Sequence, residues 1–593
     1  MFDPSLQRSH SCGELRATHV GQVVTLNGWV RKRRDMGQLI FIDLRDRMGI
    51  TQIVFDPGHP DAHAAAKELR AEFVISVKGS VRSRGDQVNT GLPTGEIELL
   101  ATSLTILNKA ETPPFHLDDE AETDDTRLAH RYLDLRRPHL QAALVARHEI
   151  ALAVRNYLDA ERFIEIETPM LTKSTPEGAR DYLVPSRIHP GAFYALPQSP
   201  QLLKQLLMIA GMDRYFQIAR CFRDEDLRAD RQPEFTQVDV EMSFATQNDV
   251  FRVTEGFVQA AFAARNIHVH TPFPRLSYRD AMDSYGTDKP DLRFGLEIKD
   301  VTAVLKSAAF NAFKETVAAG GAVKALRVPS GATLTRKQLD ELGRAASAAG
   351  AKGVLSVKYE QDGRKSSLAK YLNDAEWQAL DSALGTQQGD CVLMIADALK
   401  TARAAMGAVR LALGSMLGLV AHGSFSLCWI TDFPLFAWDE EEKRWVSEHH
   451  PFTAPALEDM ALLESSPGSI RSCSYDLVVN GFECASGSIR IHDAAVQERV
   501  FTLLKLGKEE IDSRFGFFIE ALKFGAPPHA GIAVGLDRLT MLILGRQSLR
   551  DVIAFPKTQK ATDLMTGAPS PVRDDQLAEL HIGTRDAPTE SKP

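Results

Sequence analysis

The sequence predicts a large multidomain α+β protein with a small N-terminal β-barrel, a larger antiparallel-sheet domain and an inserted α+β domain. Its 593 residues are 44% hydrophobic, which is enough apolar material for several separate cores. Short strands separated by turns fill residues 13–108, and two apolar strands flank a long charged loop at 222–235. Between 290 and 425, strands and helices alternate with their own apolar periodicity.

The composition excludes several classes of protein. The formal net charge of −9 argues against a general nucleic-acid coat, although a local basic face could still bind one folded RNA. The six cysteines include no Cys-x-x-Cys pair, so we expect neither a zinc ribbon nor a disulfide framework. No apolar run is long enough to span a bilayer, and residues 1–10 lack the apolar segment of an export signal. We therefore expect a cytoplasmic protein outside the membrane.

Residues 1–108 are predicted to form a five-stranded barrel of the OB type. Cations run from Arg31 to Arg34 before Phe41, and Gln52 follows on the next predicted strand. Cations for phosphates, an aromatic ring for stacking and an amide for base edges suit a face that binds single-stranded nucleic acid. Alternatively, Phe41 belongs to the core and the basic run is a solvated edge. The strands are expected at 23–30, 39–44, 50–55, 73–81 and 97–107, with a helix at 61–72.

Residues 109–139 read as a hinge between domains. They contain Pro113-Pro114, an acidic run at 118–125 and the arginine-rich run 131–137. Like charges crowded beside a proline pair resist burial. The larger domain is then expected at 140–290 and 426–562, the inserted domain at 291–425, and a loose polar extension at 563–593.

The larger domain begins with a helix and a strand and continues into a pocket-forming helix. The helix is predicted at 140–161, and the strand at 163–169 stops at Pro169. A second helix starts near Gln201 and carries Lys204 three residues later. Both side chains can therefore point toward one pocket, although a lysine beside an apolar run is more often a surface residue.

The charged loop at 222–235 is the strongest candidate for a polyanion site. Arginines alternate with carboxylates between strands predicted at 214–221 and 236–244. Arginine offers a planar fork of donors that grips phosphate and carboxylate groups, whereas a solvated hairpin more often uses lysine. An exposed charged hairpin remains the alternative for this stretch taken alone.

Candidate ligands of a metal ion occur late in the chain. Asp476 and Glu483 flank a buried strand, and paired acids near a nucleotide suit magnesium. The adjacent His449 and His450 should diverge on an extended segment, and no set with zinc spacing accompanies them. We therefore expect no structural zinc there.

Three stretches, taken in order, resemble the motifs of class II aminoacyl-tRNA synthetases. They are the strand ending at Pro169, the hairpin opening Phe222-Arg223-Asp224-Glu225, and residues 531–539 with their spaced glycines and Arg538. Residues 131–137, 198–204 and 228–235 resemble the bacterial-type aspartyl-tRNA synthetases, and the resemblance covers essentially the whole chain. It implies a catalytic antiparallel sheet flanked by helices, a homodimer formed through the first motif, and a barrel that reads the tRNA anticodon through Arg34, Phe41 and Gln52.

The resemblance also implies the substrates and the roles of individual residues. ATP and L-aspartate would form aspartyl-adenylate, and the aspartyl group would then pass to tRNA, with Mg²⁺ held by Glu483 and Asp476. Catalysis would fall to Arg223, Glu225 and Arg538. The implied aspartate-binding set is Glu177, Ser199, Gln201, Lys204, Arg223, Asp239, His449 and Arg490, and the implied ATP-binding set is Arg223, Asp224, Glu225, Gln232, Glu483, Gly535, Leu536, Asp537 and Arg538.

Several questions stay open at the level of sequence. The family usually has three consecutive glycines where this chain has Cys484-Ala485-Ser486-Gly487, which leaves the approach of that backbone to substrate in question. In an empty pocket, Lys204 and Arg490 would be two unpaired cations that disfavour asparagine. We expect Arg228 and Arg231 to face the tRNA acceptor end.

Two other functions remain possible. One is a non-discriminating enzyme that also aspartylates tRNA for asparagine, for which the region of Met36 and 83–85 is the place to look. The other is a non-catalytic OB-fold RNA-binding paralogue, which the retained Arg223, Glu225, Glu483 and Arg538 argue against.

Overall fold

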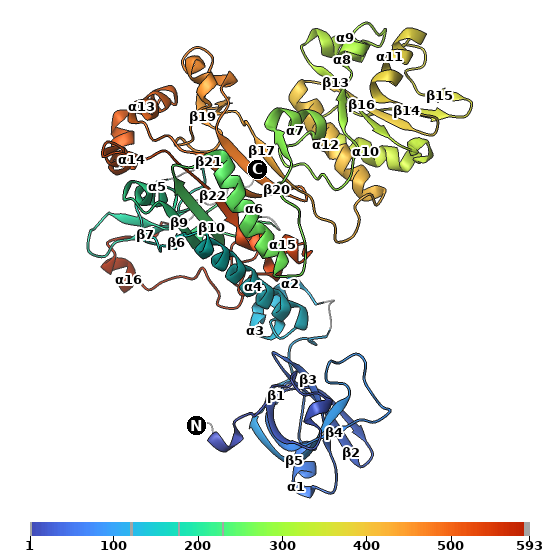
Figure 1. Cartoon of the computed structure of the whole chain (residues 1–593), viewed down its shortest axis with the longest axis vertical. Coiled ribbons are helices and arrows are strands. Elements are labelled where there is room, and N and C mark those ends of the chain that lie inside the picture. The colour runs from blue at the N-terminus through green and yellow to red at the C-terminus, as the bar shows by residue number, and fades with distance from the viewer. Residues whose placement is uncertain (1–2, 119–121, 176–177, 228–229, 586–593) are drawn as a thin grey trace. The chain divides into compact units, whose positions relative to one another are not determined.

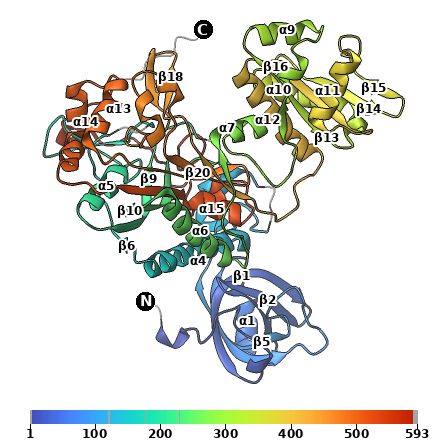
Figure 2. The same cartoon turned by 45° about the horizontal axis from the view of Figure 1, so that its top comes forward.

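The computed structural model describes residues 3–118, 122–175, 178–227 and 230–585. They form two compact units, residues 1–144 with 562–569, and residues 145–561 with 570–593 (Figures 1 and 2). No helix in these described ranges is long and apolar enough to cross a membrane.

The first unit contains a closed barrel with strand order β1-β2-β3-β5-β4, which confirms the predicted barrel (Figure 2). Ile40, Ile42 and Leu44 of β2 point into its core, as the period of two in a strand requires. The helix after the third strand is shorter than predicted: the N–H groups of residues 67–69 bond carbonyls three residues earlier, as in a turn, and Glu72 has a positive φ of 65°. The elements are β1 (Val23–Met36), β2 (Leu39–Asp46), β3 (Gly49–Phe55), α1 (Pro60–Ala66), β4 (Val74–Ser83) and β5 (Ile97–Asn108).

The second half of the predicted hinge is helical and partly buried. It forms α2 (Asp124–Ala129) and α3 (Arg131–Asp134). Asp134 is completely buried, at 2.6 Å from Arg131 and 2.9 Å from Arg137. Arg131, Asp134 and Arg137 are therefore buried because they pair with one another, which the sequence pattern alone did not indicate.

The second unit is built around an eight-stranded sheet of order β11-β17-β20-β21-β22-β10-β9-β6. Its middle strands are antiparallel, and the outermost pairs at both edges are parallel. The predicted hairpin is confirmed as β9 paired with β10. The strands are β6 (Ile164–Glu165), β9 (Arg214–Phe222), β10 (Glu234–Ser243), β11 (Arg275–Ser277), β17 (Leu427–Thr431), β20 (Ser474–Val479), β21 (Phe482–Ile489) and β22 (His529–Gly535).

The predicted strand at 163–169 is reduced to the two residues of β6. Thr168 bonds the Gln217 side chain instead of a strand backbone, and Pro169 has no N–H to offer a ladder. Two short hairpins, β7 (Leu183–Pro185) with β8 (Phe193–Ala195) and β18 (Phe436–Asp439) with β19 (Arg444–Ser447), lie outside the main sheet.

Helices cover the main sheet, and α6 packs against it through a stack of Phe251 on Trp429 of β17, with ring centroids 4.1 Å apart (Figure 1). Because α5 starts directly after Pro200, Gln201 and Lys204 lie on its first turns, as predicted. The helices are α4 (Pro138–Ala160), α5 (Gln201–Ile209), α6 (Gln247–Ala263), α7 (Tyr278–Tyr285), α13 (Ala494–Leu503), α14 (Lys508–Leu522), α15 (Leu536–Ile543) and α16 (Asp574–Glu579).

The inserted segment forms a five-stranded sheet of order β12-β13-β16-β14-β15 with an apolar core on each face. One core contains residues of α10 and α12, and the other contains residues of α8, α9 and α11. The strands are β12 (Ile298–Asp300), β13 (Ala322–Val328), β14 (Leu355–Glu360), β15 (Gly363–Lys365) and β16 (Cys391–Asp397); the helices are α8 (Thr302–Leu305), α9 (Asn311–Ala318), α10 (Arg336–Ala348), α11 (Asp374–Leu384) and α12 (Leu399–Met416).

Candidate active site

Small residues in the middle of the main sheet create a hollow. Across the sheet, Asp239 pairs with Ala533, Ala533 with Ser486, and Ser486 with Asp476. Residues directly opposite one another share a face, so one row runs from an acid through two small side chains to another acid. The hollow is a cavity of about 380 Å³, which is a size typical of small-molecule sites.

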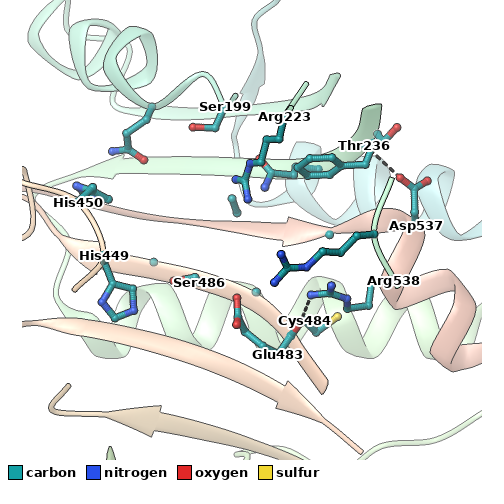
Figure 3. A pocket seen from close by; sticks show the side chains of 18 of the residues that line it. Ser199, Arg223, Thr236, His449, His450, Glu483, Cys484, Ser486, Asp537 and Arg538 are labelled. Atoms are coloured by element: carbon teal, nitrogen blue, oxygen red, sulfur yellow. Dashed lines mark hydrogen bonds between the residues drawn. The ribbon is translucent and has the colours of Figure 1, made fainter. Parts of the chain in front are cut away.

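Most of the predicted site residues line this cavity (Figure 3). They are Ser199, Gln201, Lys204, Arg223, Glu225, Gln232, His449, Glu483, Arg490, Gly535, Asp537 and Arg538. Among the described residues predicted to bind aspartate, ATP or Mg²⁺, four are not part of the lining: Asp224, Asp239, Asp476 and Leu536. Leu536 is fully buried in α15. Glu177 lies outside the described residues.

Two arginines reach the cavity from opposite walls. Arg223 follows β9, and its guanidinium lies 5.1 Å from the centroid of the Phe235 ring. Arg538 comes from the first turn of α15 and donates through Nη1 to the Glu483 carbonyl at 2.7 Å. Figure 3 shows both side chains pointing into the same space. Their forked donors suit the oxygens of a phosphate chain.

The end of the charged loop folds onto this part of the cavity. Asp230 lies 3.3 Å from Arg538, and Arg231 lies 2.8 Å from Glu225. Asp230 was not predicted as a site residue, and Arg231 was assigned to the tRNA acceptor end. The alternation of charges in the loop was the available signal for the pair of Arg231 with Glu225, which lies six residues away. The partner of Asp230 lies in a distant segment, so no local pattern indicated it. Arg228 lies outside the described residues.

The other end of the cavity holds a buried network of four charges. Lys204 Nζ lies 2.6 Å from Asp239 and 3.3 Å from Glu241, and Arg490 lies 2.9 Å from Glu241. Each side chain is at most 2% exposed. The expectation of two unpaired cations is therefore wrong, because an unpaired charge at such depth would be too costly. Glu241 was missed, although its spacing of two from Asp239 on a strand indicates the same face.

Burial raises the pKa of Glu241, but the neighbouring Arg490 and Lys204 cations outweigh this and hold that pKa below its ordinary value. The acid therefore stays ionised at neutral pH and pairs with both cations.

The two adjacent histidines contact different groups, as their divergence on an extended segment predicts. His450 Nε2 lies 2.8 Å from Arg490 Nη1, and burial with the nearby guanidinium holds the pKa of His450 well below its ordinary value. His449 packs edge-on against Phe433 and lies 3.8 Å from Asp476. Burial lowers the pKa of His449, but Asp476 outweighs that effect and the net shift is upward. His450 therefore acts as a neutral acceptor, which sequence reasoning did not single out.

Buried polar atoms that lack hydrogen bonds gather in or beside the cavity. In the described part of the chain they include Gln201 Nε2, Arg223 Nε, Asp239 Oδ2, His449 Nδ1, Asp476 Oδ1 and Arg538 Nε. Buried polar groups are normally satisfied, so such a concentration indicates a polar ligand.

Two predicted ATP contacts have their polar atoms occupied by the protein itself. Asp537 accepts from Arg147 and from the Thr236 N–H, each at 2.7 Å. The Gln232 amide accepts from the Lys557 N–H at 2.8 Å and donates to the Lys557 carbonyl at 3.1 Å. Both side chains line the cavity, but these bonds join its walls together.

The departure from the family's glycine run leaves the strand intact. In β21, Ala485 and Ser486 pair with both neighbouring strands. A Cβ added to Gly487 would lie 2.3 Å from the Gly531 carbonyl, so that glycine is required. Ala485 is buried, and Ser486 adds a hydroxyl to the cavity wall. Of the family's glycine run, only the position of Gly487 therefore requires glycine, because the neighbouring strand lies too close for a Cβ.

The two predicted magnesium ligands offer a donor set that fits the ion. Burial and the neighbouring Asp476 raise the pKa of Glu483, and a buried oxygen of Asp476 has no hydrogen bond. No group of three or more candidate metal ligands occurs among the described residues. Two carboxylates suit Mg²⁺, which usually keeps waters and phosphate oxygens as its other ligands.

In the first unit, the three predicted nucleic-acid contacts lie together on the barrel. Phe41 is only partly buried and lies between the core residues Ile40 and Ile42, so the alternative that Phe41 is a core residue is wrong. Arg34 bonds Asp43 at 2.7 Å and Gln52 at 3.1 Å. Gln52 in turn donates to Glu98 at 2.7 Å. Asp43 and Glu98 orient this face and were not predicted.

Comparison with known proteins matches the barrel to one family model and most of the remaining chain to another. Residues 123–559 match the family model described as tRNA synthetases class II (D, K and N), and residues 24–107 match the OB-fold nucleic acid binding domain. An aspartate–tRNA ligase of Geobacillus kaustophilus is 53% identical over 97% of this chain and 99% of that relative. An aspartate–tRNA(Asp/Asn) ligase of Desulfatibacillum aliphaticivorans is 51% identical over 98% of this chain and 99% of its own length.

Solved structures share the fold at low identity. An asparaginyl-tRNA synthetase of Pyrococcus horikoshii in complex with asparaginyl-adenylate superposes with a TM-score of 0.58 at 18% identity, over 93% of this chain and 98% of that chain. A structure described as a putative aspartyl-tRNA synthetase of Leishmania major has a TM-score of 0.58 at 19% identity, over 92% of both chains.

Proposed function

The chain belongs to the class II tRNA synthetases, in the aspartate–tRNA ligase group, and we propose that it joins L-aspartate to tRNA in two ATP-dependent steps. The observation that carries this proposal is a single cavity with two unlike ends. One end holds Lys204 and Arg490 in a buried charge network, and the other holds the forks of Arg223 and Arg538. An amino acid with an acidic side chain and a nucleotide can thus meet in one cavity.

In the first step, the α-carboxylate of aspartate attacks the α-phosphorus of ATP. A carboxyl oxygen–phosphorus bond forms, and the bond to the departing pyrophosphate breaks. Arg223 bridges the carboxylate and the α-phosphate, Arg538 holds the terminal phosphate, and Glu225 faces the adenine. Because charge concentrates at phosphorus, fixed donors and correct positioning supply the catalysis, and no protein nucleophile is needed.

Glu483 and Asp476 would hold Mg²⁺, which when bound supplies positive charge to the phosphate oxygens. In the second step, a hydroxyl of the terminal ribose of tRNA attacks the activated carbonyl, and AMP leaves.

Selection of aspartate over asparagine follows from the hydrogen-bond donors at the end of the cavity that holds Lys204 and Arg490. Lys204 and Arg490 present only donors to the substrate side chain, and His449 lies nearby on the cavity wall. The amide of asparagine would place its own N–H groups against them and leave donors unpaired. Ser199 and Gln201, with Glu177 and Asp239, would face the ammonium group.

A second candidate function is charging of tRNA for asparagine as well. Relatives that are 50–52% identical carry the name aspartate–tRNA(Asp/Asn) ligase, which supports this broader activity. Side-by-side charging of the two tRNA transcripts decides between them: aspartylation of the asparagine transcript establishes the broader enzyme, and its absence excludes it.

We also propose that the chain acts in the cytoplasm as a homodimer formed through the first motif. Large apolar side chains are exposed on and near that motif, including Leu152, Ile164 and Leu171. Exposed apolar groups of this kind mark association surfaces. Sedimentation of the full chain at micromolar concentration should give the mass of two copies, and a monomer would exclude the proposal.

Exchange of labelled pyrophosphate into ATP tests the primary function. Exchange should require L-aspartate and be abolished by Arg223→Ala. Arg252→Ala, which removes a half-exposed arginine of α6 that is not part of the lining, serves as the matched control and should leave exchange unchanged. Silence with every amino acid would favour the non-catalytic RNA-binding alternative and overturn the synthetase.

A further inference from the structure

We propose that Asp230 is a further functional residue of the nucleotide site: its carboxylate competes with the terminal phosphate of ATP for Arg538, so that ATP must displace it. This inference rests on the proposed ATP site and deepens it. It concerns a residue in the charged loop that no earlier step in the mechanism uses.

The contacts of Arg538 carry the inference. Its Nη2 atom donates to the Asp230 carbonyl at 3.1 Å and lies 3.3 Å from the Asp230 carboxylate. Its Nη1 atom donates to the Glu483 carbonyl at 2.7 Å. The fork that would receive a terminal phosphate is therefore closed by acceptors of the protein, one of them an anion with the oxygens that a phosphate would offer.

The neighbouring residue of the loop makes a matching contact. Arg231 lies 2.8 Å from Glu225, the carboxylate proposed to face the adenine. Asp230 and Arg231 also line the cavity. Two successive residues of opposite charge thus each pair with a group of opposite charge on the cavity wall, and together they cover both the phosphate and the adenine positions.

The ion pair between Asp230 and Arg538 is weak enough for a phosphate to replace the carboxylate. The Asp230 side chain is 36% exposed and that of Arg538 is 25% exposed. Ion pairs near solvent contribute little, because water and salt screen them. A triphosphate carries several charges and can replace a single carboxylate on Arg538, whereas AMP has no terminal phosphate to compete there. Return of Asp230 to Arg538 would then favour release of pyrophosphate.

The test is calorimetric titration of the full chain with ATP and with AMP, in the absence of aspartate. Asp230→Asn removes the charge but keeps the backbone contact, so ATP should bind roughly two- to fivefold more tightly, the range expected for a screened ion pair. AMP affinity should stay unchanged. Asp230→Glu, which retains the charge, should return ATP affinity toward that of the wild type.

Asp226→Asn is the matched control, because it removes one exposed carboxylate from the same loop, and Asp226 does not line the cavity. An equal gain with this control, an equal gain for AMP, or unchanged or weaker ATP binding by Asp230→Asn would overturn the inference while leaving the ATP site standing. Failure of the wild-type chain to bind either nucleotide would overturn the proposed function together with the inference.

Discussion

At the scale of single residues, the charge balance at the Lys204–Arg490 end of the cavity depends on Glu241. This carboxylate bonds Arg490 through both of its oxygens, at 2.9 and 3.2 Å, and contacts Lys204. A Cβ at Gly531 would lie 1.9 Å from Glu241 Oε2. The glycine on the opposite strand therefore leaves the space that this carboxylate occupies. Positive charge is thus held ready for substrate without being left unpaired.

We expect Glu241→Gln to destabilise the chain by roughly 3–5 kcal/mol, because it leaves buried cations short of one negative charge. The shift in the urea midpoint of unfolding measures the effect. The matched control is Glu234→Gln in the same strand, whose partly exposed carboxylate pairs with Arg220 and Lys557. That change should cost about 1 kcal/mol or less, as for other screened pairs. Equal losses in the two variants would contradict the prediction.

The same residue predicts a pH dependence. Since the pKa of Glu241 is lower in the folded state than in the unfolded chain, its stabilisation is present above the unfolded pKa of about 4.3 and is lost as pH falls through the folded value. The urea midpoints of wild type and Glu241→Gln should therefore converge on acidification. A constant difference would show that the stabilisation does not depend on ionisation.

At the scale of elements, α7 is tied to the inserted sheet by charge. Lys324 of β13 is 1% exposed and bonds Asp283 of α7 at 2.8 Å, and it lies 3.1 Å from Asp300 of β12. Arg403 of α12 contacts Asp283 from another direction, also at 2.8 Å. Two elements of the insertion, β13 and α12, therefore meet the preceding helix at one carboxylate, and Asp300 of β12 adds a second acid to Lys324.

We expect Asp283→Ala to loosen this joint, because it removes the acid that Lys324 and Arg403 share. A loss of about 1–3 kcal/mol is expected, since the carboxylate is partly exposed. Lys324→Met is the paired variant; it should cost less, because Arg403 still pairs with Asp283, and Asp300, whose side chain is 49% exposed, can be hydrated instead. Hydrogen exchange in β13 and α12 should rise more in Asp283→Ala than in Lys324→Met. Equal exchange in both variants would count against the joint.

At the scale of the whole molecule, the barrel and the catalytic sheet belong to separate compact units. The aromatic side chain of Phe41 lies on the outside of β2, beside Arg34 and Gln52, and far in sequence from the catalytic residues. The anticodon recognition predicted for the barrel and the proposed activation of aspartate should therefore be separable.

We expect Phe41→Ala to leave pyrophosphate exchange unchanged and to raise the KM for tRNA about ten- to hundredfold, because stacking on an aromatic ring contributes about 1–3 kcal/mol per base. Lys78→Ala removes an exposed cation of β4 on the same barrel and controls for general loss of positive charge. Its effect on the KM for tRNA should be small. Loss of exchange in Phe41→Ala would refute this separation of roles.

The sequence by itself determined the features that depend on local pattern. Alternation predicted the barrel strands and the β9–β10 hairpin, and the spacing of Gln201 and Lys204 placed both side chains at one pocket. Motifs with characteristic residues at short spacing identified the family. These signals are local because the period of a strand or helix, and the chemistry of a short motif, are written within a few residues.

Only the tertiary structure decided which charges neutralise one another. The partners of Lys204, Arg490 and Arg538 lie in other strands or in the charged loop, so no local pattern pairs them. The structure likewise decided that Asp537 and Gln232 join walls of the cavity, and that Gly487 alone of its run must be glycine. The physical reason is that burial removes solvent: a charge or a Cβ must then be matched by whatever the fold brings beside it, and that neighbour comes from a distant part of the chain.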